Sequence, residues 1–267
     1  MSSTPRVTLV TLFPKMLEGP LAEGVVGQAI RDGLIQVDFL NPRDQTHDRH
    51  RTVDDRPFGG GDGMVMLVEP LVNTLKPLHE RGAKLVYMSP QGPVLTSQKA
   101  RELAQVEDLV LISGRYGGID QRIMSLLPIE ELSVGDYVLS GGEPAMWIVL
   151  DALARFVPGV LGSGDSANQD SFEGGVLECP QYTRPREILG LEVPNVLLSG
   201  DHKKISEFRS LVSGLITLQK RPDLFRQELG SNKKFVLKMR QLLDSLSEDE
   251  RKVLGITLKP EELTQWE

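Results

Sequence analysis

Four loops rich in glycine or proline have a composition suited to holding a small molecule. They are residues 58–63, 89–93, 113–118 and 135–142. Glycine allows a positive φ and a close approach of the backbone, and ligands of open α/β sheets bind outside the carboxyl ends of strands. Any one of these loops could be no more than a tight turn. The last three together predict a ligand site with backbone donors and acceptors.

The familiar nucleotide and metal motifs are absent from the sequence. No Gly-x-Gly-x-x-Gly follows the first predicted strand and no Gly-x-x-x-x-Gly-Lys-Ser/Thr occurs, which disfavours a Rossmann dehydrogenase and a P-loop NTPase. His47 and His50 are three residues apart, but histidines in so polar a segment are more often surface residues than metal ligands. A single cysteine, Cys179, excludes a cysteine cluster.

Residues 41–58 are dense in charges of both signs and too polar for a core. They are typical of a salt-bridged surface loop. They are equally typical of a recognition loop, because Arg and Asp together can contact a base edge and its phosphates. Composition alone leaves both interpretations open.

The elements that must position these loops alternate between strand and helix. Helical spacing of leucines predicts a helix over 68–81, and 145–157 reads as an apolar helix. Four mostly apolar, β-rich segments predict buried strands at 7–13, 35–40, 84–89 and 108–113. Strands that alternate with helices indicate an α/β fold with a mostly parallel sheet.

The C-terminal third has a different pattern. Residues 162–171 are small and polar, which predicts a flexible linker or mobile loop. Beyond Pro194 the spacing predicts helices at 205–216, 222–229 and 234–246, with Ser247 as the N-cap of another. The predicted organisation is therefore an α/β domain at 1–161, a linker at 162–171 and a small α-helical domain at 172–267.

The net charge of the 267 residues is −7, which by itself argues against a nucleic-acid partner. The charge is unevenly distributed, however. Residues 1–180 hold 15 basic and 24 acidic side chains, whereas residues 184–240 hold 12 basic and 6 acidic ones. No apolar run approaches the roughly 20 residues of a membrane span, no signal peptide is recognisable, and the single cysteine fits a reducing cytoplasm.

Seven ordered motifs resemble those of the bacterial tRNA (guanine-N1)-methyltransferases, which modify guanosine 37 beside the anticodon. The resemblance runs from Phe13 to about Leu229, which is most of the chain. The motifs are Asn41-Pro42-Arg43-Asp44, Thr52 to Gly61, Ser89-Pro90-Gln91-Gly92, Gly114-Arg115-Tyr116, Gly135 to Glu143, Asp170-Ser171-Phe172 and Tyr182-Thr183-Arg184-Pro185.

This resemblance implies a SPOUT-type fold, in which the mostly parallel sheet carries a deep C-terminal trefoil knot and a small α-helical domain follows. It implies a homodimer with composite active sites that uses S-adenosyl-L-methionine, bound in a bent shape. The cofactor-binding residues that it implies are Pro90, Gly92, Gly114, Tyr116, Gly135, Tyr137, Leu139, Gly141 and Gly142.

The resemblance also implies roles in catalysis. Asp170 matches the general base that removes the N1 proton of guanine, and Arg155 matches the arginine that stabilises the charge on O6. Asp54 matches a residue that contacts the guanosine region. Further tRNA contacts, mainly to phosphates of the anticodon arm, are implied for Arg184, Lys203, Lys204, Arg209, Lys220 and Arg221, and in the same basic run for Lys233, Lys234, Lys238 and Arg240.

The sequence departs from the family pattern at a few positions. Gly117 replaces a usual Glu, Gln181 a usual His, Glu178 a usual Asp and Asp62 a usual Pro. Family enzymes use Mg²⁺, but without the acid at position 117 its location is unknown. Asp170 and Arg155 are intact, so we predict an active enzyme. The alternatives are a knotted methyltransferase acting on a different RNA and a non-catalytic RNA-binding protein of the same fold.

Overall fold

The computed structural model describes residues 4–60, 63–162 and 170–266. The chain forms two compact units, residues 1–164 and 165–267. No helix in the described ranges is both long enough and apolar enough to cross a membrane.

The first unit is built on a five-stranded sheet whose order is β2-β1-β6-β5-β7. Every neighbouring pair in it is parallel, which confirms the predicted α/β class. The strands span Arg6–Val10 (β1), Gln36–Leu40 (β2), Lys84–Met88 (β5), Asp108–Ser113 (β6) and Ile129–Leu132 (β7). The strand predicted at 7–13 ends at Val10, because the Phe13 N–H donates to Thr11 Oγ1 at 2.9 Å and closes a turn.

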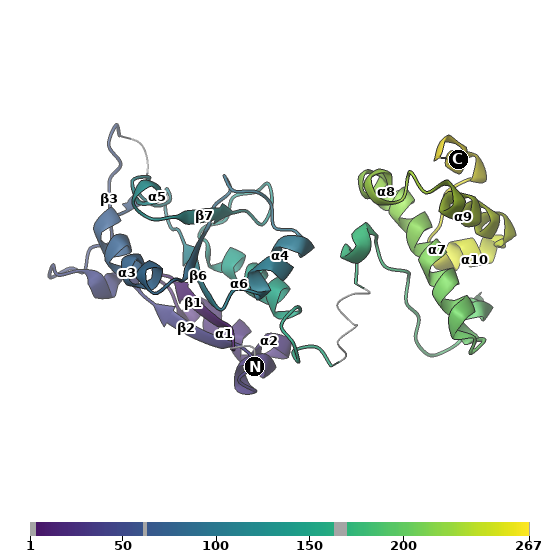
Figure 1. Cartoon of the computed structure of the whole chain (residues 1–267), viewed down its shortest axis with the longest axis horizontal. Helices are drawn as coiled ribbons and strands as arrows, with labels where there is room; N and C mark the ends of the chain where they lie inside the picture. Colours follow the sequence, from purple (N-terminus) through teal and green to yellow (C-terminus); the bar gives the residue numbers. More distant parts are fainter. Residues whose placement is uncertain (1–3, 61–62, 163–169, 267) are drawn as a thin grey trace. The chain divides into compact units, whose positions relative to one another are not determined.

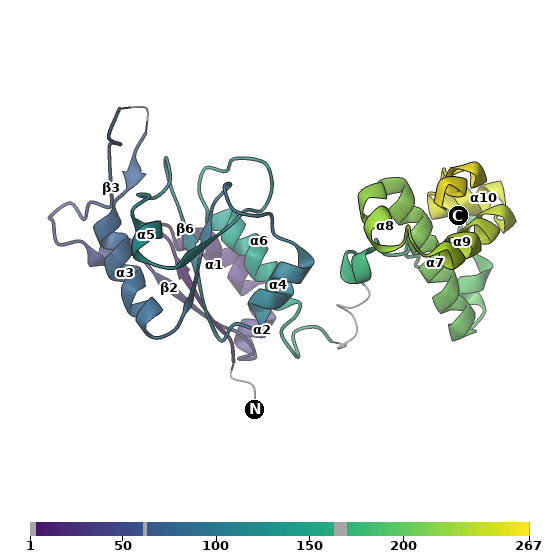
Figure 2. The same ribbon diagram turned by 45° about the horizontal axis from the view of Figure 1, so that its top comes forward.

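Helices cover both faces of this sheet, as Figures 1 and 2 show. One face packs against α1, α2, α4 and α6, which span Lys15–Ala22, Gly24–Arg31, Ser97–Ala104 and Glu143–Ala154. The other packs against α3 and α5, which span Val68–Glu80 and Ile123–Leu126. Successive side chains of a strand point to opposite faces. Accordingly, Leu9 and Leu111 belong to the first core, whereas Val10 and Ile112 belong to the second.

The edge strand β7 was not predicted, because its two central residues are acidic. Glu130 forms ion pairs with Lys84 at 2.9 Å and with Lys99, so neighbouring cations compensate its charge. After β7 the chain returns to the segment that follows β6. There Arg115 and Gly141 form an antiparallel bridge, and the Gly142 N–H donates to the Gly114 carbonyl at 3.0 Å. A short hairpin, β3 (Asp54–Asp55) with β4 (Val65–Met66), precedes α3.

The second unit contains α7 (His202–Lys220), α8 (Pro222–Glu228), α9 (Lys233–Ser245) and α10 (Glu248–Leu254). A hairpin of β8 (Glu187–Ile188) and β9 (Leu191–Glu192) precedes them. Helix α7 is longer at both ends than the predicted 205–216: the Asp201 side chain caps its start, and it continues to Lys220, two residues before Pro222 begins α8. Ser247 forms the expected N-cap, in a capping box with Glu250. The core of this unit includes Val212, Leu215, Phe225, Met239 and Leu243.

Candidate functional site

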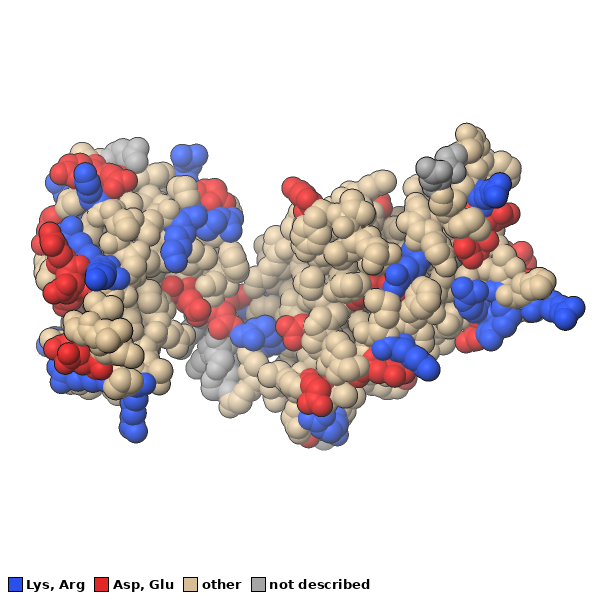
Figure 3. All heavy atoms as spheres, turned by 180° about the vertical axis from the view of Figure 1, so that it is seen from behind, with Lys and Arg blue, Asp and Glu red and all other residues tan. Residues whose placement is uncertain are grey.

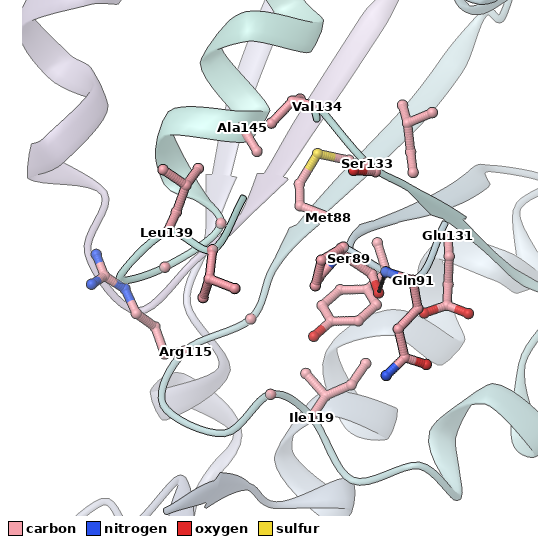
Figure 4. Close-up of a pocket in the computed structure, with 18 of the residues that line it drawn as sticks. Met88, Ser89, Gln91, Arg115, Ile119, Glu131, Ser133, Val134, Leu139 and Ala145 are labelled. Atoms are coloured by element: carbon pink, nitrogen blue, oxygen red, sulfur yellow. Dashed lines mark hydrogen bonds between the residues drawn. The ribbon is translucent and has the colours of Figure 1, made fainter. Parts of the chain in front are cut away.

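The three loops that follow β5, β6 and β7 surround one pocket of about 320 Å³ (Figure 4). This volume lies at the lower end of the range for small-molecule sites, roughly 300–1,000 Å³. The structure brings eight of the nine predicted cofactor-binding residues to its lining: Pro90, Gly114, Tyr116, Gly135, Tyr137, Leu139, Gly141 and Gly142.

Glycine at these positions lets the loops pack against one another. A Cβ at Gly114 would lie 2.6 Å from the Tyr87 hydroxyl, and one at Gly142 would lie 2.9 Å from the Ser113 Cα. Gly135 has a φ of +147°, a conformation that other residues rarely adopt. The glycines therefore shape the pocket by allowing close contacts between its loops, in addition to leaving backbone groups open to a ligand.

Gly92, the ninth predicted residue, does not line this pocket. A Cβ there would lie 2.5 Å from the carbonyl carbon of Glu131 and 2.5 Å from the nitrogen of Leu132. Gly92 thus allows the 89–93 loop to pack directly on the end of β7, while its neighbours Pro90 and Gln91 reach the pocket.

Several lining residues outside the three predicted loops were missed by sequence reasoning, among them Tyr87 and Glu131. Figure 4 shows Gln91 and Glu131 on the opposite side of the pocket from Arg115. Burial raises the pKa of Tyr87, the nearby negative charge of Glu131 raises it further, and a hydrogen bond from the Ile119 backbone opposes both. The sequence did contain a signal for β7, the strand that carries Glu131. The other two loops of the site each follow a predicted strand, so a third strand was to be expected before the 135–142 loop.

Besides Gly92, two predicted residues of the first unit lie outside this lining, Asp54 and Arg155. Asp54 is half-buried on β3, in the hairpin with β4. Arg155 is the exposed C-cap residue of α6. The ring of the next residue, Phe156, lies under the Arg101 guanidinium, whose Cζ is 4.4 Å from the ring centroid.

The charged segment 41–58 is tied together by its own side chains. Arg43 Nη1 donates to the Arg51 carbonyl at 3.0 Å, and Arg51 forms an ion pair with Asp44. Hydrogen bonds from Thr52 lower the pKa of Asp48. Of the two interpretations of this segment, these contacts favour the salt-bridged surface loop. Arg49 and His50 are exposed and accessible to a partner.

Asp170 belongs to the second unit, where it borders a pocket of about 740 Å³. The lining also includes the polar residues Glu178, Gln181, His202 and Arg209, and the apolar Leu229 and Phe235. Most of the predicted linker, residues 163–169, lies outside the described residues. Burial raises the pKa of Cys179 in this pocket to about 11, so its thiol is protonated at neutral pH and is not a reactive nucleophile.

The cations predicted to contact tRNA lie on the surface of the second unit. Arg184, Lys203, Lys204, Arg209 and Lys220 are exposed, while Arg221 is half-buried. Acidic neighbours engage part of this charge: Arg221 Nη2 lies 2.6 Å from Asp223, and Lys204 Nζ lies 3.4 Å from Asp201. On the face that Figure 3 draws, Lys and Arg of this unit lie beside Asp and Glu.

The described residues provide no preformed cation site, because no group of three or more His, Cys, Asp and Glu among them is arranged to hold a metal. Position 117 is also tightly packed. A Cβ at Gly117 would lie 3.0 Å from the Met64 carbonyl oxygen, which accepts a hydrogen bond of 2.8 Å from the Gly117 N–H and so joins the 113–118 loop to the residue before β4.

The chain is similar to known proteins over most of its length. Residues 5–227 match the family model described as tRNA (Guanine-1)-methyltransferase TrmD. A tRNA (guanine-N(1)-)-methyltransferase of Pseudoalteromonas atlantica is 52% identical over 219 residues, 81% of this chain and 83% of the relative. A protein of the same name from Marinomonas is 47% identical over 247 residues, 91% of this chain and 99% of the relative.

A third relative of that name, from Shewanella amazonensis, is 52% identical over 220 residues, 81% of this chain and 88% of the relative. The family match extends from the start of the first unit through the loops of the pocket to α8 of the second unit. On these matches, the chain belongs to the tRNA (guanine-1)-methyltransferase TrmD family.

Proposed function

We propose that the protein transfers a methyl group from S-adenosyl-L-methionine to N1 of guanosine 37 in tRNA. The observation that carries this proposal is the pocket at the carboxyl ends of β5, β6 and β7, which eight of the nine residues implied by the motifs line. Its glycines and half-exposed tyrosines offer backbone groups and ring faces, which suit an adenosine moiety. The names of the relatives supply the substrate class.

The bound donor supplies an electrophilic methyl group, and residues of the chain prepare the guanine. N1 of neutral guanine carries a proton, so a base must accept it before or during transfer. Asp170 takes this role through its carboxylate. Loss of the proton spreads negative charge onto O6, and the guanidinium of Arg155 stabilises that charge by hydrogen bonding. Asp54 contacts the region around the guanosine.

The fold that accompanies this chemistry is the SPOUT type with a C-terminal trefoil knot. Its support is the path of the chain after β7, which returns from the sheet edge and pairs Gly141 with Arg115. We further propose three functional segments: a cofactor-binding domain at 1–161, a linker at 162–171, and a helical tRNA-binding domain at 172–267. The two compact units support this division.

The active form is a homodimer with composite sites. The pocket belongs to the first unit and Asp170 to the second, so the reacting groups come from different parts of the chain. The first unit also exposes large apolar side chains, which a second copy would cover: Phe13, Met16, Val138 and Ile148. The protein acts in the cytoplasm, where its tRNA substrate is found, and Mg²⁺, if used, is not held by a preformed acidic cluster of the described residues.

The exposed cations of the second unit bind phosphates of the anticodon arm. Lys203, Lys204 and Arg209 lie along one helix, α7, and Lys220 lies at its end. Their attraction for tRNA is expected to weaken with salt, because each phosphate contact releases counterions.

The experiment that tests the function uses unmodified tRNA with guanosine at position 37 and a labelled methyl donor. Nucleoside analysis should find N1-methylguanosine, and a matched tRNA with adenosine at position 37 should stay unlabelled. Label in a different RNA of a mixed pool, but not in tRNA, would favour another substrate. Binding of tRNA without any label would favour a non-catalytic RNA-binding protein. Either result would refute the proposal.

A further inference from the structure

A buried ionic cluster lies beside the candidate cofactor pocket. Glu143, the first residue of α6, is fully buried, and the Arg115 side chain is 13% exposed. Arg115 Nη2 lies 2.9 Å from Glu143 Oε2. The other carboxylate oxygen, Oε1, accepts a hydrogen bond of 2.6 Å from the hydroxyl of Thr11, which is also buried.

The Arg115 guanidinium contacts several other parts of the chain. Its Nη1 donates to the Ser140 carbonyl at 3.2 Å, and its Nη2 lies 2.6 Å from Met16 Sδ. The ring of Phe13 lies 4.5 Å below it. One side chain thus ties together the loop after β6, the loop before α6 and the start of α1.

Removing charges from water is costly, so a buried ion pair is weak grounds for inferring added stability. The cost is not fully recovered here. Among the described residues, neither Arg115 Nε nor Glu143 Oε2 has an aligned hydrogen-bond partner, and the two side chains meet as an ion pair rather than as an aligned fork. Such a pair calls for another explanation, and its position at the junction of two pocket loops provides one.

We propose that Arg115 is a positioning residue for cofactor binding. Anchored by Glu143 and Thr11, its guanidinium holds the 139–142 loop against the 113–118 loop and keeps the pocket in its binding shape before the cofactor enters. This inference rests on the proposed function, since it takes the pocket to be the S-adenosyl-L-methionine site.

The same arrangement explains the glycine at position 141. A Cβ at Gly141 would collide with the Arg115 side chain, lying 2.5 Å from its Cζ and even closer to its Nε. The 139–142 loop can therefore receive the guanidinium only if residue 141 lacks a side chain. The packing of Arg115 is therefore sufficient to require this glycine.

The test is a double-mutant cycle that measures the dissociation constant of S-adenosyl-L-methionine by calorimetry. Its variants are Gly141→Ala, the pair Arg115→Ala with Glu143→Gln, and all three changes together. The pair is changed together because Arg115→Ala alone would leave a buried, unpaired carboxylate that endangers folding. The surface pair Arg81→Ala with Asp108→Asn, which removes a bidentate ion pair of the same unit away from the pocket, is the matched control. Circular dichroism checks folding.

We expect Gly141→Ala to weaken binding by about tenfold or more in the wild-type background and by less than about threefold in the Arg115→Ala/Glu143→Gln background, because coupled residues are non-additive. The double variant itself should raise the KM for the cofactor with little change in the KM for tRNA. Arg115→Lys should rescue part of the loss, since one ammonium can reach Glu143 or the Ser140 carbonyl but lacks the planar fork.

Equal effects of Gly141→Ala in both backgrounds would overturn the proposal, because the ligand itself would then require the glycine. Wild-type affinity in the Arg115→Ala/Glu143→Gln variant would overturn it as well. Failure of the wild-type protein to bind S-adenosyl-L-methionine is a different outcome, which would instead refute the proposed function of the pocket.

Discussion

Replacing Gly92 by alanine should weaken cofactor binding even though residue 92 does not line the pocket. A Cβ there would lie 2.5 Å from backbone atoms of Glu131 and Leu132, whereas ordinary contacts begin at 3.4 Å. The 89–93 loop must therefore move by about 0.9 Å, the difference between these distances, because the atoms it meets belong to the β7 backbone and cannot rotate away. Pro90 and Gln91 move with the loop and no longer line the pocket in the same way.

A misplacement of about 1 Å in an active site can lower the reaction rate on the order of 100-fold, and the same loss of fit should weaken binding of the cofactor. We therefore expect Gly92→Ala to raise the dissociation constant of S-adenosyl-L-methionine by about 10- to 100-fold, or roughly 1.4–2.7 kcal/mol. Isothermal titration calorimetry measures this value directly. Gly19→Ala is the control, since nothing lies within 4 Å of a Cβ at that helical position. Wild-type affinity in Gly92→Ala would show that the contact between the 89–93 loop and β7 does not set the pocket's shape, and would refute the reasoning.

Three further predictions concern the second unit. Asp170→Asn should lower turnover by at least about 100-fold while the affinity for S-adenosyl-L-methionine is unchanged, and turnover at the wild-type rate would exclude Asp170 as the base. Reversing the charge of four exposed lysines should weaken tRNA binding and flatten its dependence on salt. The substitutions are Lys203→Glu, Lys204→Glu, Lys233→Glu and Lys234→Glu, and filter binding between 50 and 200 mM salt measures their effect. Cys179 should resist iodoacetamide at pH 8 until the chain is unfolded, because burial raises its pKa to about 11. The folded state holds the thiol proton more tightly than the unfolded state, in which the thiol has its ordinary pKa of 9.0, so stability should fall as the pH rises from about 9 toward 11. Rapid labelling of Cys179 in the native protein would contradict this account.

The local sequence pattern predicted those helices and strands whose own residues favour a single secondary structure. The apolar runs at 84–88 and 108–113 form β5 and β6 at the centre of the sheet, where both faces are covered, so their sequences could be continuous and apolar. Ser247 with Glu250 supplied a capping box that fixed the start of α10.

Some elements have residue types that are compensated only by residues distant in the sequence, and these elements could not be predicted in this way. The acidic Glu130 and Glu131 make the β7 segment unlike a typical buried strand. The lysines that compensate Glu130 lie on β5 and α4, so the sequence of β7 alone does not reveal them. The same limit applies to the pocket. Sequence motifs brought its glycines together, but they did not reveal that Gly92 packs on β7 or that Gly141 makes room for Arg115, since both facts depend on how separate loops meet.

The separate hydrophobic cores of the two units have a consequence for measurements of this chain. Side chains of the sheet and its helices form the cores on the two faces of the sheet, and side chains that include those of α7–α10 form the core of the second unit. All-or-none unfolding holds for small single domains, and a chain of two compact units need not follow it. A differential scanning calorimeter should then record two endotherms, so a single midpoint would not characterise the protein. The methyl donor should shift the endotherm of the first unit alone, by mass action, and that selectivity would reveal which unit any other ligand or substitution affects.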